Sequence, residues 1–143
     1  DLHSFPTRRS SDLLSRRETS LQGSPGVHLT GWLSDAALRS VVAGSQGLAL
    51  PSLDEGFGLP VVETLACGLP VLTSDLPVFS EVAGEFAVTC RPTETDSIVQ
   101  ALITLSQAET VPEAAARRRA WASAFTWERC AERTLDAYLR VVS

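Results

Sequence analysis

The sequence predicts an α/β domain with a doubly wound, parallel, Rossmann-like sheet and additional helices at the C-terminus. Short apolar runs that resemble buried strands alternate with amphipathic helical stretches up to about residue 90, which indicates parallel βαβ units. A glycine-rich loop directly follows one of these runs and opens a helix. After residue 90 the pattern is only helical, so the last helices either pack back onto the domain or cover a neighbouring one.

The individual elements follow from hydrophobic periodicity and from turn residues. Ser34 and Thr126 are suitable N-caps, and Pro77 suits the first turn of a helix. The expected strands are 27–29, 47–51, 70–73 and 86–89. The expected helices are 14–22 (the end of one), 34–44, 59–67, 77–84, 94–108, 112–124 and 127–142.

Length and composition exclude several classes of protein. The 143 residues form one domain that is large enough for a core, and the net charge of −5 argues against a nucleic-acid binder. The three cysteines are widely spaced, so a disulfide framework or a metal site is not expected, and Cys67 at a helix end is expected to be buried and non-catalytic. No apolar run reaches the ~20 residues of a membrane helix, so we expect a cytoplasmic protein.

Residues 1–13 have neither a helical nor a strand period. This segment can be back-translated into a common sequencing-library adapter. We therefore expect it to be foreign to the natural protein and disordered, and the natural domain to occupy residues 14–143. The alternative is a polar, disordered N-terminal tail.

The stretch 55–63, Glu-Gly-Phe-Gly-Leu-Pro-Val-Val-Glu, is the most informative part of the chain. It follows an apolar run and opens a helix, and ligands of open α/β sheets bind beyond the carboxyl ends of strands. Gly56 and Gly58 have no Cβ, so their amides can closely approach an oxygen-rich ligand. The helix start favours a phosphate, and ionised carboxylates accept hydrogen bonds from sugar hydroxyls. Phosphate and hydroxyls together indicate a nucleotide sugar.

The longer run 50–71 resembles the donor-binding motif of retaining glycosyltransferases of the GT-B fold, most closely family four. The resemblance continues upstream in 31–34 and downstream in 73–75, 81–84 and 125–128, and it covers roughly residues 27–142. It implies that the chain is part of the C-terminal, donor-binding domain of a bacterial enzyme of polysaccharide biosynthesis. Such an enzyme transfers a sugar from a GDP- or UDP-sugar to a glycan or a lipid-linked acceptor.

The resemblance also implies roles for individual residues. Glu55 would be catalytic, because a carboxylate beside the donor sugar stabilises an oxocarbenium-like transition state. Glu63 would accept hydrogen bonds from the ribose hydroxyls, although an acid near a helix N-terminus is also favourable by itself. The remaining donor-binding candidates are Gly56, Phe57 and Gly58 at the sugar, Leu59 and Val61 under the diphosphate, and Trp32 and Leu33 at the nucleobase. Phe57 and Trp32 have plain core packing as an alternative.

The same resemblance implies parts that this chain lacks. A GT-B enzyme has two Rossmann-like domains, and the first, which contacts the acceptor, has no counterpart here. The Arg and Lys that neutralise the departing diphosphate belong to strands upstream of this chain, and none of its arginines stands in a matching context. We therefore expect the chain alone to be inactive. No metal cofactor is expected, and the full-length protein could contact the inner face of the membrane peripherally.

Two further interpretations stay open. Glycogen- or sucrose-synthase-like enzymes share the double-glutamate motif but have different flanking sequences. A non-catalytic sugar-nucleotide-binding or interaction module would use the same fold without the chemistry.

Overall fold

A computed structural model describes residues 23–109 and 111–142 of the chain. The chain forms two compact units, Asp1–Ala36 and Ala37–Ser143, and each is described by itself. The expectations for residues 1–13 and for a helix over 14–22 lie outside the described residues and stay predictions.

The described part of the first unit corrects one expected strand. Residues 27–29 form no strand, and the Val27 amide instead donates to the Ser24 carbonyl at 3.1 Å in a turn. Val27 and Leu29 are both exposed. A strand exists only through a hydrogen-bonded neighbour, and no described segment pairs with these residues. Helix α2 (Asp35–Ala43) begins where Ser34 predicted it, and most of its residues belong to the second unit.

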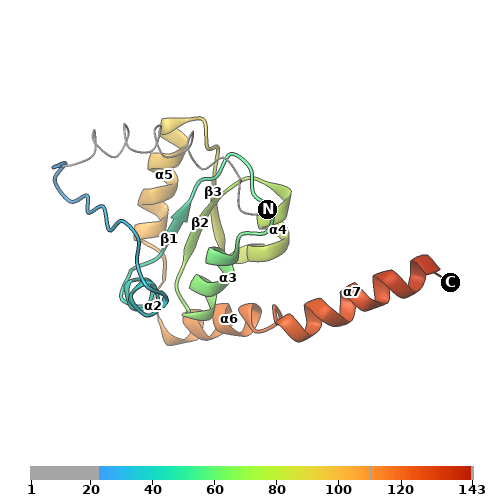
Figure 1. Cartoon of the computed structure of the whole chain (residues 1–143). Coiled ribbons are helices and arrows are strands. Elements are labelled where there is room, and N and C mark those ends of the chain that lie inside the picture. Colours follow the sequence, from blue (N-terminus) through green and yellow to red (C-terminus); the bar gives the residue numbers. More distant parts are fainter. Residues whose placement is uncertain (1–22, 110, 143) are drawn as a thin grey trace, which may run out of the picture. The chain divides into compact units, whose positions relative to one another are not determined.

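The second unit contains a three-stranded parallel sheet in the order β1-β2-β3 (Figure 1). The strands are β1 (Leu48–Leu50), β2 (Val71–Ser74) and β3 (Ala87–Cys90), each within a residue of its expected place. In the central strand, Thr73 lies opposite Leu50 of β1 and Thr89 of β3. The parallel pairing confirms the α/β fold class.

Helices cover both faces of this sheet, as the sequence predicts for a doubly wound fold. They are α3 (Leu59–Ala66), α4 (Pro77–Ala83), the 3₁₀ turn η1 (Gly84–Phe86), α5 (Thr95–Ser106), α6 (Pro112–Ala122) and α7 (Trp127–Val142). One core cluster joins Val71 of β2 to α3, α4 and α6, and includes Phe79. A second joins Leu72 of β2 to α5 through Cys90 and Ala101. Adjacent residues of a strand point to opposite faces, so β2 contributes to both clusters.

The three consecutive arginines of α6 each have a structural partner. Arg117 pairs with Glu85 at 2.9 Å and lies over the Phe86 ring. Arg118 is buried, and burial lowers the pKa of its guanidinium. It donates to the main-chain carbonyls of Gly68 at 3.2 Å and Glu109 at 2.9 Å. Periodicity places residues on a helix but does not show what the helix packs against.

Arg119 contacts the end of α3, where the expectation for Cys67 is wrong. Its guanidinium donates to the Cys67 carbonyl at 3.4 Å, so α6 contacts the backbone of Cys67. The Cys67 side chain, expected to be buried, is exposed. The cations at this helix end are favourably placed, because the C-terminus of a helix carries partial negative charge.

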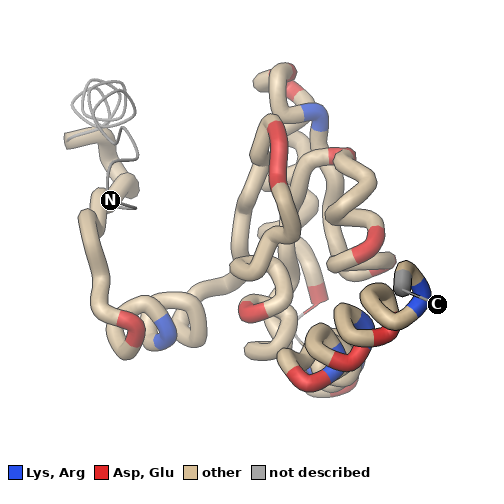
Figure 2. Tube along the Cα trace, turned by 45° about the vertical axis from the view of Figure 1, so that its right-hand side comes forward, with Lys and Arg blue, Asp and Glu red and all other residues tan. Residues whose placement is uncertain are grey.

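Helix α7 begins where Thr126 caps it, since the Thr126 hydroxyl accepts from the Arg129 amide at 3.2 Å. Within the second unit, α6 packs back onto the domain, whereas α7 extends away from the sheet (Figure 1). Its described side chains are exposed. Apart from Arg39 and Arg91, every described arginine lies on α6 or α7, where acidic residues accompany them (Figure 2).

Candidate functional site

The predicted site lies at the carboxyl edge of the sheet, where the three strands end. The loop over residues 51–58 leaves β1 there, and the Ser74 hydroxyl at the end of β2 donates to the Ser52 carbonyl. The Asp75 amide donates to the Cys90 carbonyl at 3.1 Å and ties the ends of β2 and β3 together. The glycine-rich motif is therefore fixed at the edge where ligands of α/β sheets bind.

Gly58 makes the turn from this loop into α3. It adopts a left-handed conformation with φ 87° and ψ 48°, which L-residues with a side chain rarely adopt. A Cβ at Gly58 would lie 2.8 Å from Cε1 of the buried Phe79. No described side chain caps the start of α3, whose second residue is Pro60. Pro60 has no N–H to offer, and the Val61 amide donates to the Gly58 carbonyl. Binding of an oxygen-rich ligand at this helix start stays a prediction.

The two glutamates of the motif occupy different surroundings. Glu55 is half-buried on the loop, and its carboxylate accepts from the following Gly56 amide at 3.2 Å. Its own amide donates to the Asp54 carboxylate at 3.0 Å. Glu63 is exposed in the second turn of α3. Both carboxylates can therefore accept hydrogen bonds from ligand hydroxyls.

The apolar residues of the motif divide between packing and exposure. The Phe57 ring packs edge-to-face on Phe125, with 6.1 Å between centroids, but Phe57 stays 40% exposed and belongs to neither core cluster. Val61 is fully buried and its amide donates to the Gly58 carbonyl at 2.9 Å. Leu59 is partly exposed and, with Phe57, lines an apolar groove of about 840 Å³ that α6 and α7 border. The prediction that Phe57, Leu59 and Val61 contact a donor is not tested by these contacts and stays a prediction.

Trp32 and Leu33 belong to the first unit. The Trp32 side chain is 97% exposed, so plain core packing does not explain it within that unit. Leu33 is half-buried. Their assignment to a nucleobase pocket also stays a prediction.

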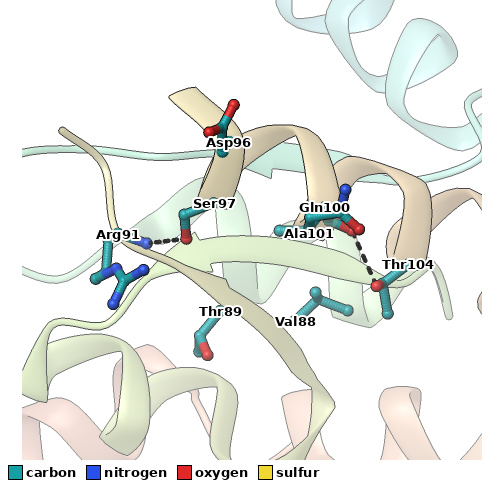
Figure 3. Close-up of a pocket in the computed structure, with 8 residues that line it drawn as sticks. All are labelled: Val88, Thr89, Arg91, Asp96, Ser97, Gln100, Ala101 and Thr104. Carbon is teal, nitrogen blue, oxygen red and sulfur yellow. Dashed lines mark hydrogen bonds between the residues drawn. The ribbon is translucent and has the colours of Figure 1, made fainter. Parts of the chain in front are cut away.

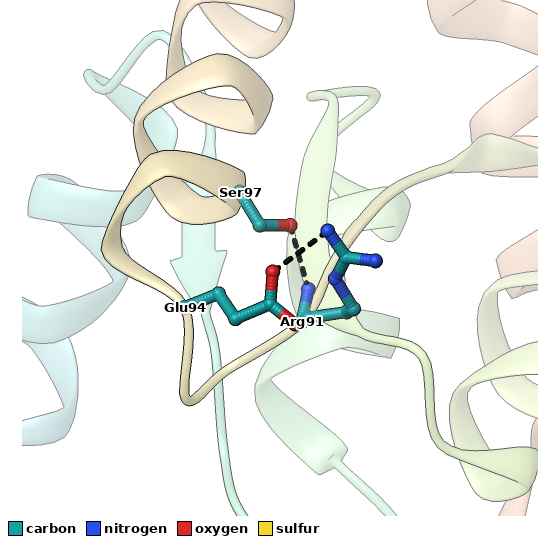
Figure 4. Close-up of polar contacts among 3 residues, drawn as sticks. All are labelled: Arg91, Glu94 and Ser97. Atoms are coloured by element: carbon teal, nitrogen blue, oxygen red, sulfur yellow. Dashed lines mark hydrogen bonds and ion pairs between the residues drawn. The ribbon is translucent and has the colours of Figure 1, made fainter.

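A second, shallow groove of about 430 Å³ runs between β3 and α5 (Figure 3). At its end Arg91 follows β3, and its amide donates to the Ser97 hydroxyl at 2.9 Å. The Arg91 guanidinium pairs with Glu94 at 2.7 Å, with both side chains largely exposed (Figure 4). This guanidinium is thus neutralised by a neighbour in the described structure.

Two residues within the runs that carry the resemblance shape the motif through contacts that the sequence did not predict. Ser52 holds the loop through its carbonyl, and Phe125 supports the Phe57 ring. Neither has a local signal, because both contacts join segments that are far apart in the chain. Among the described residues, no group of three or more His, Cys, Asp or Glu could hold a metal ion. None of the described helices is both long and apolar enough to cross a membrane.

Comparison with known families decides the class of protein. The family model "Glycosyl transferases group 1" matches residues 7–108, which is more than half of the chain. The chain belongs to the group 1 glycosyl transferases. The family predicted from the motif is confirmed, and with it membership of an enzyme family that transfers glycosyl groups.

Three curated relatives of this group 1 glycosyl transferase are bacterial mannosyltransferases. O-antigen chain mannosyltransferase B of Escherichia coli is 34% identical over 113 residues, covering 78% of this chain and 30% of that protein. The MMP alpha-(1->4)-mannosyltransferase of Mycolicibacterium hassiacum is 32% identical over 125 residues, or 82% of this chain and 30% of that protein. A GDP-mannose-dependent alpha-(1-6)-phosphatidylinositol dimannoside mannosyltransferase of Mycobacterium tuberculosis is 33% identical over 121 residues, covering 83% of this chain and 31% of that protein. The chain thus spans about a third of the length of these relatives.

The fold has a solved counterpart. Sucrose-phosphate synthase from Thermosynechococcus elongatus matches with a TM-score of 0.75 and 23% identity, covering 97% of this chain and 37% of that one. At this identity the likeness supports the GT-B type of fold and says nothing of the substrate.

Proposed function

We propose that this chain is the donor-binding part of a retaining glycosyltransferase that uses a nucleotide-diphosphate sugar. The observation that carries the proposal is the start of α3. A left-handed glycine and a helix N-terminus without a side-chain cap stand there at the end of the loop 51–58, which follows the parallel strand β1. Such a helix start binds phosphate groups through its amides and its dipole. The glutamates on either side of it add acceptors for sugar and ribose hydroxyls.

Within this proposal the two glutamates have different tasks. Glu63 binds the ribose hydroxyls of the donor before and during the reaction. Glu55 lies beside the donor sugar, where its charge stabilises the positive charge that develops at the anomeric carbon. Backbone amides of Gly56, Phe57 and Gly58 contact the sugar, and the turn at Leu59 and Val61 supports the diphosphate.

The rest of the site lies in parts of the protein beyond this chain. A glycan or lipid-linked acceptor binds to another domain, whereas Trp32 and Leu33 of this chain line the nucleobase pocket. We propose that transfer needs no metal ion, because basic side chains and helix N-termini stabilise the diphosphate. Mannose is the favoured sugar, since the relatives described above are mannosyltransferases.

Binding to the chain itself tests the donor site. We expect millimolar binding of GDP-mannose by saturation-transfer NMR, and we expect Glu63→Gln to weaken it by about tenfold, because hydrogen bonds to a charged group are lost. Glu113→Gln is the matched control, since Glu113 is an exposed glutamate in the first turn of α6. Equal affinities of the Glu63→Gln and Glu113→Gln variants would contradict the proposed role of Glu63.

Turnover separates the two glutamates. In a chimera, this chain replaces the matching segment of O-antigen chain mannosyltransferase B, with which it is 34% identical. We expect Glu55→Gln mainly to lower kcat and Glu63→Gln mainly to raise KM, because only the first acts chiefly in the transition state. If the chain were a non-catalytic binding module, the chimera would bind GDP-mannose without transferring mannose.

A further inference from the structure

Thr73 carries a buried hydroxyl that has no partner among the described residues. The residue is fully buried in the middle of the sheet, and its Oγ1 is without a hydrogen bond. The other buried threonine, Thr64, donates to the Pro60 carbonyl at 2.7 Å. Buried polar groups in native proteins are nearly always paired, because an unpaired one has lost its hydration. The Thr73 hydroxyl is therefore an exception among the buried polar groups of the described residues.

The strand geometry places this hydroxyl under the motif. Side chains alternate along a strand, so Thr73 points to the same face as Val71, which packs under α3 and α4. Thr73 also lies opposite Leu50, the last residue of β1. Helix α3 starts at this carboxyl edge and runs back toward the start of β2. Thr73 accordingly lies near the carboxyl end of β2, on the face that α3 and α4 cover.

The neighbouring residue shows how this strand holds the loop. Ser74 points to the opposite face, and its hydroxyl already bonds the Ser52 carbonyl. Farther along the loop, the amides of Glu55 and Gly56 bond only to carboxylates of the loop itself in the described structure. The end of β2 thus places two hydroxyls near the loop 51–58. The Ser74 hydroxyl is hydrogen-bonded to the loop, and the Thr73 hydroxyl is not.

We propose that Thr73 is a positioning residue whose hydroxyl gains a partner in the loop 51–58 when a nucleotide sugar binds there. The inference rests on the proposed function. An unpaired buried hydroxyl raises the free energy of the ligand-free chain. In the bound arrangement the loop supplies a hydrogen-bond partner, and this free-energy cost is removed. The hydroxyl therefore favours the bound arrangement, since a group can shift an equilibrium only through a difference between the two states.

Two readouts with opposite signs test the inference on the full chain. Thr73→Val keeps the shape of the side chain and removes the hydroxyl. We expect the melting temperature without ligand to rise by roughly 2–6 °C, because an unpaired buried group is gone. We expect the affinity for GDP-mannose to fall about two- to tenfold, the ratio that one neutral hydrogen bond contributes. A purely structural role would not move these readouts in opposite directions.

Two variants control the substitution. Thr73→Ser keeps the hydroxyl and loses a methyl group, so it should melt lower than Thr73→Val and retain the wild-type affinity. Thr89→Val makes the same change at an exposed position in register with Thr73 on β3, and it should change neither readout.

A lower melting temperature for Thr73→Val without ligand would overturn the inference, because the hydroxyl would then be paired in the free chain. Unchanged affinity of Thr73→Val, with binding by the wild type, would overturn it while leaving the proposed function intact. Absence of GDP-mannose and UDP-glucose binding by the wild type would overturn both.

Discussion

The two glycines of the motif should differ sharply in what they tolerate. Replacing Gly58 by alanine puts a Cβ on a residue with φ 87° and brings that atom to 2.8 Å from Phe79 Cε1 and 3.7 Å from Val61 Cγ2. Phe79 is 1% exposed and sits in the core, so its ring has little room to retreat. At Gly56 a Cβ would meet no atom within 4 Å, and its φ lies outside the left-handed region.

The cost of Gly58→Ala follows from these two features. A left-handed residue with a side chain costs about 1–2 kcal/mol. Forcing extra volume into a packed core adds about 1–3 kcal/mol. The sum, about 2–5 kcal/mol, is a large part of the ~5–15 kcal/mol that stabilises a domain. Gly56→Ala should stay within about 0.5 kcal/mol of the wild type.

Thermal unfolding followed by circular dichroism measures the difference. We expect Gly58→Ala to melt roughly 5–20 °C below the wild type and Gly56→Ala to melt within about 2 °C of it. Gly56→Ala should nevertheless weaken GDP-mannose binding, because its Cβ would stand between the loop amide and the ligand. If the two variants melted together, the close approach of Gly58 to Phe79 would not be a constraint of the fold.

Two further outcomes concern the helices behind the site. Arg118→Met leaves the carbonyls of Gly68 and Glu109 without their donor and should lower the free energy of unfolding by about 2–4 kcal/mol. Arg117→Met breaks an exposed ion pair and should lower the free energy of unfolding by less than about 1 kcal/mol. Similar losses for the two variants in urea titrations would contradict this difference. Thr126→Ala removes the cap of α7 and should cost about 1 kcal/mol, seen as faster amide hydrogen exchange in the first turn of α7 while β2 keeps its protection.

Local pattern was sufficient for most elements of the second unit. Periodicity and turn residues located β1, β2, β3 and the six α-helices from α2 to α7 to within about two residues, and Thr126 was recognised as a cap. The expected strand at 27–29 is wrong because an apolar triplet only permits a strand, and pairing depends on residues elsewhere in the chain.

The site was predictable in its position and less so in its contacts. The motif itself indicated a loop, a helix start and two available carboxylates. The different surroundings of Gly56 and Gly58 depend on Phe79, some twenty residues away, and the Phe57 ring depends on Phe125. The unpaired hydroxyl of Thr73 is likewise a property of the assembled sheet.

The contact between α6 and α3 has a consequence for reading homologous sequences. Within the described part of the chain Arg118 bonds only main-chain carbonyls, and a carbonyl is present whichever amino acid occupies positions 68 and 109. A change of side chain at position 68 or 109 cannot compensate for the loss of the Arg118 guanidinium. Among homologous sequences, a change at position 118 should therefore not be accompanied by a matching change at either position. Arg117 and Glu85, in contrast, can exchange charges and can covary. Contact maps inferred from covariation would therefore detect the exposed ion pair and overlook the buried guanidinium that contributes more to the packing of these helices.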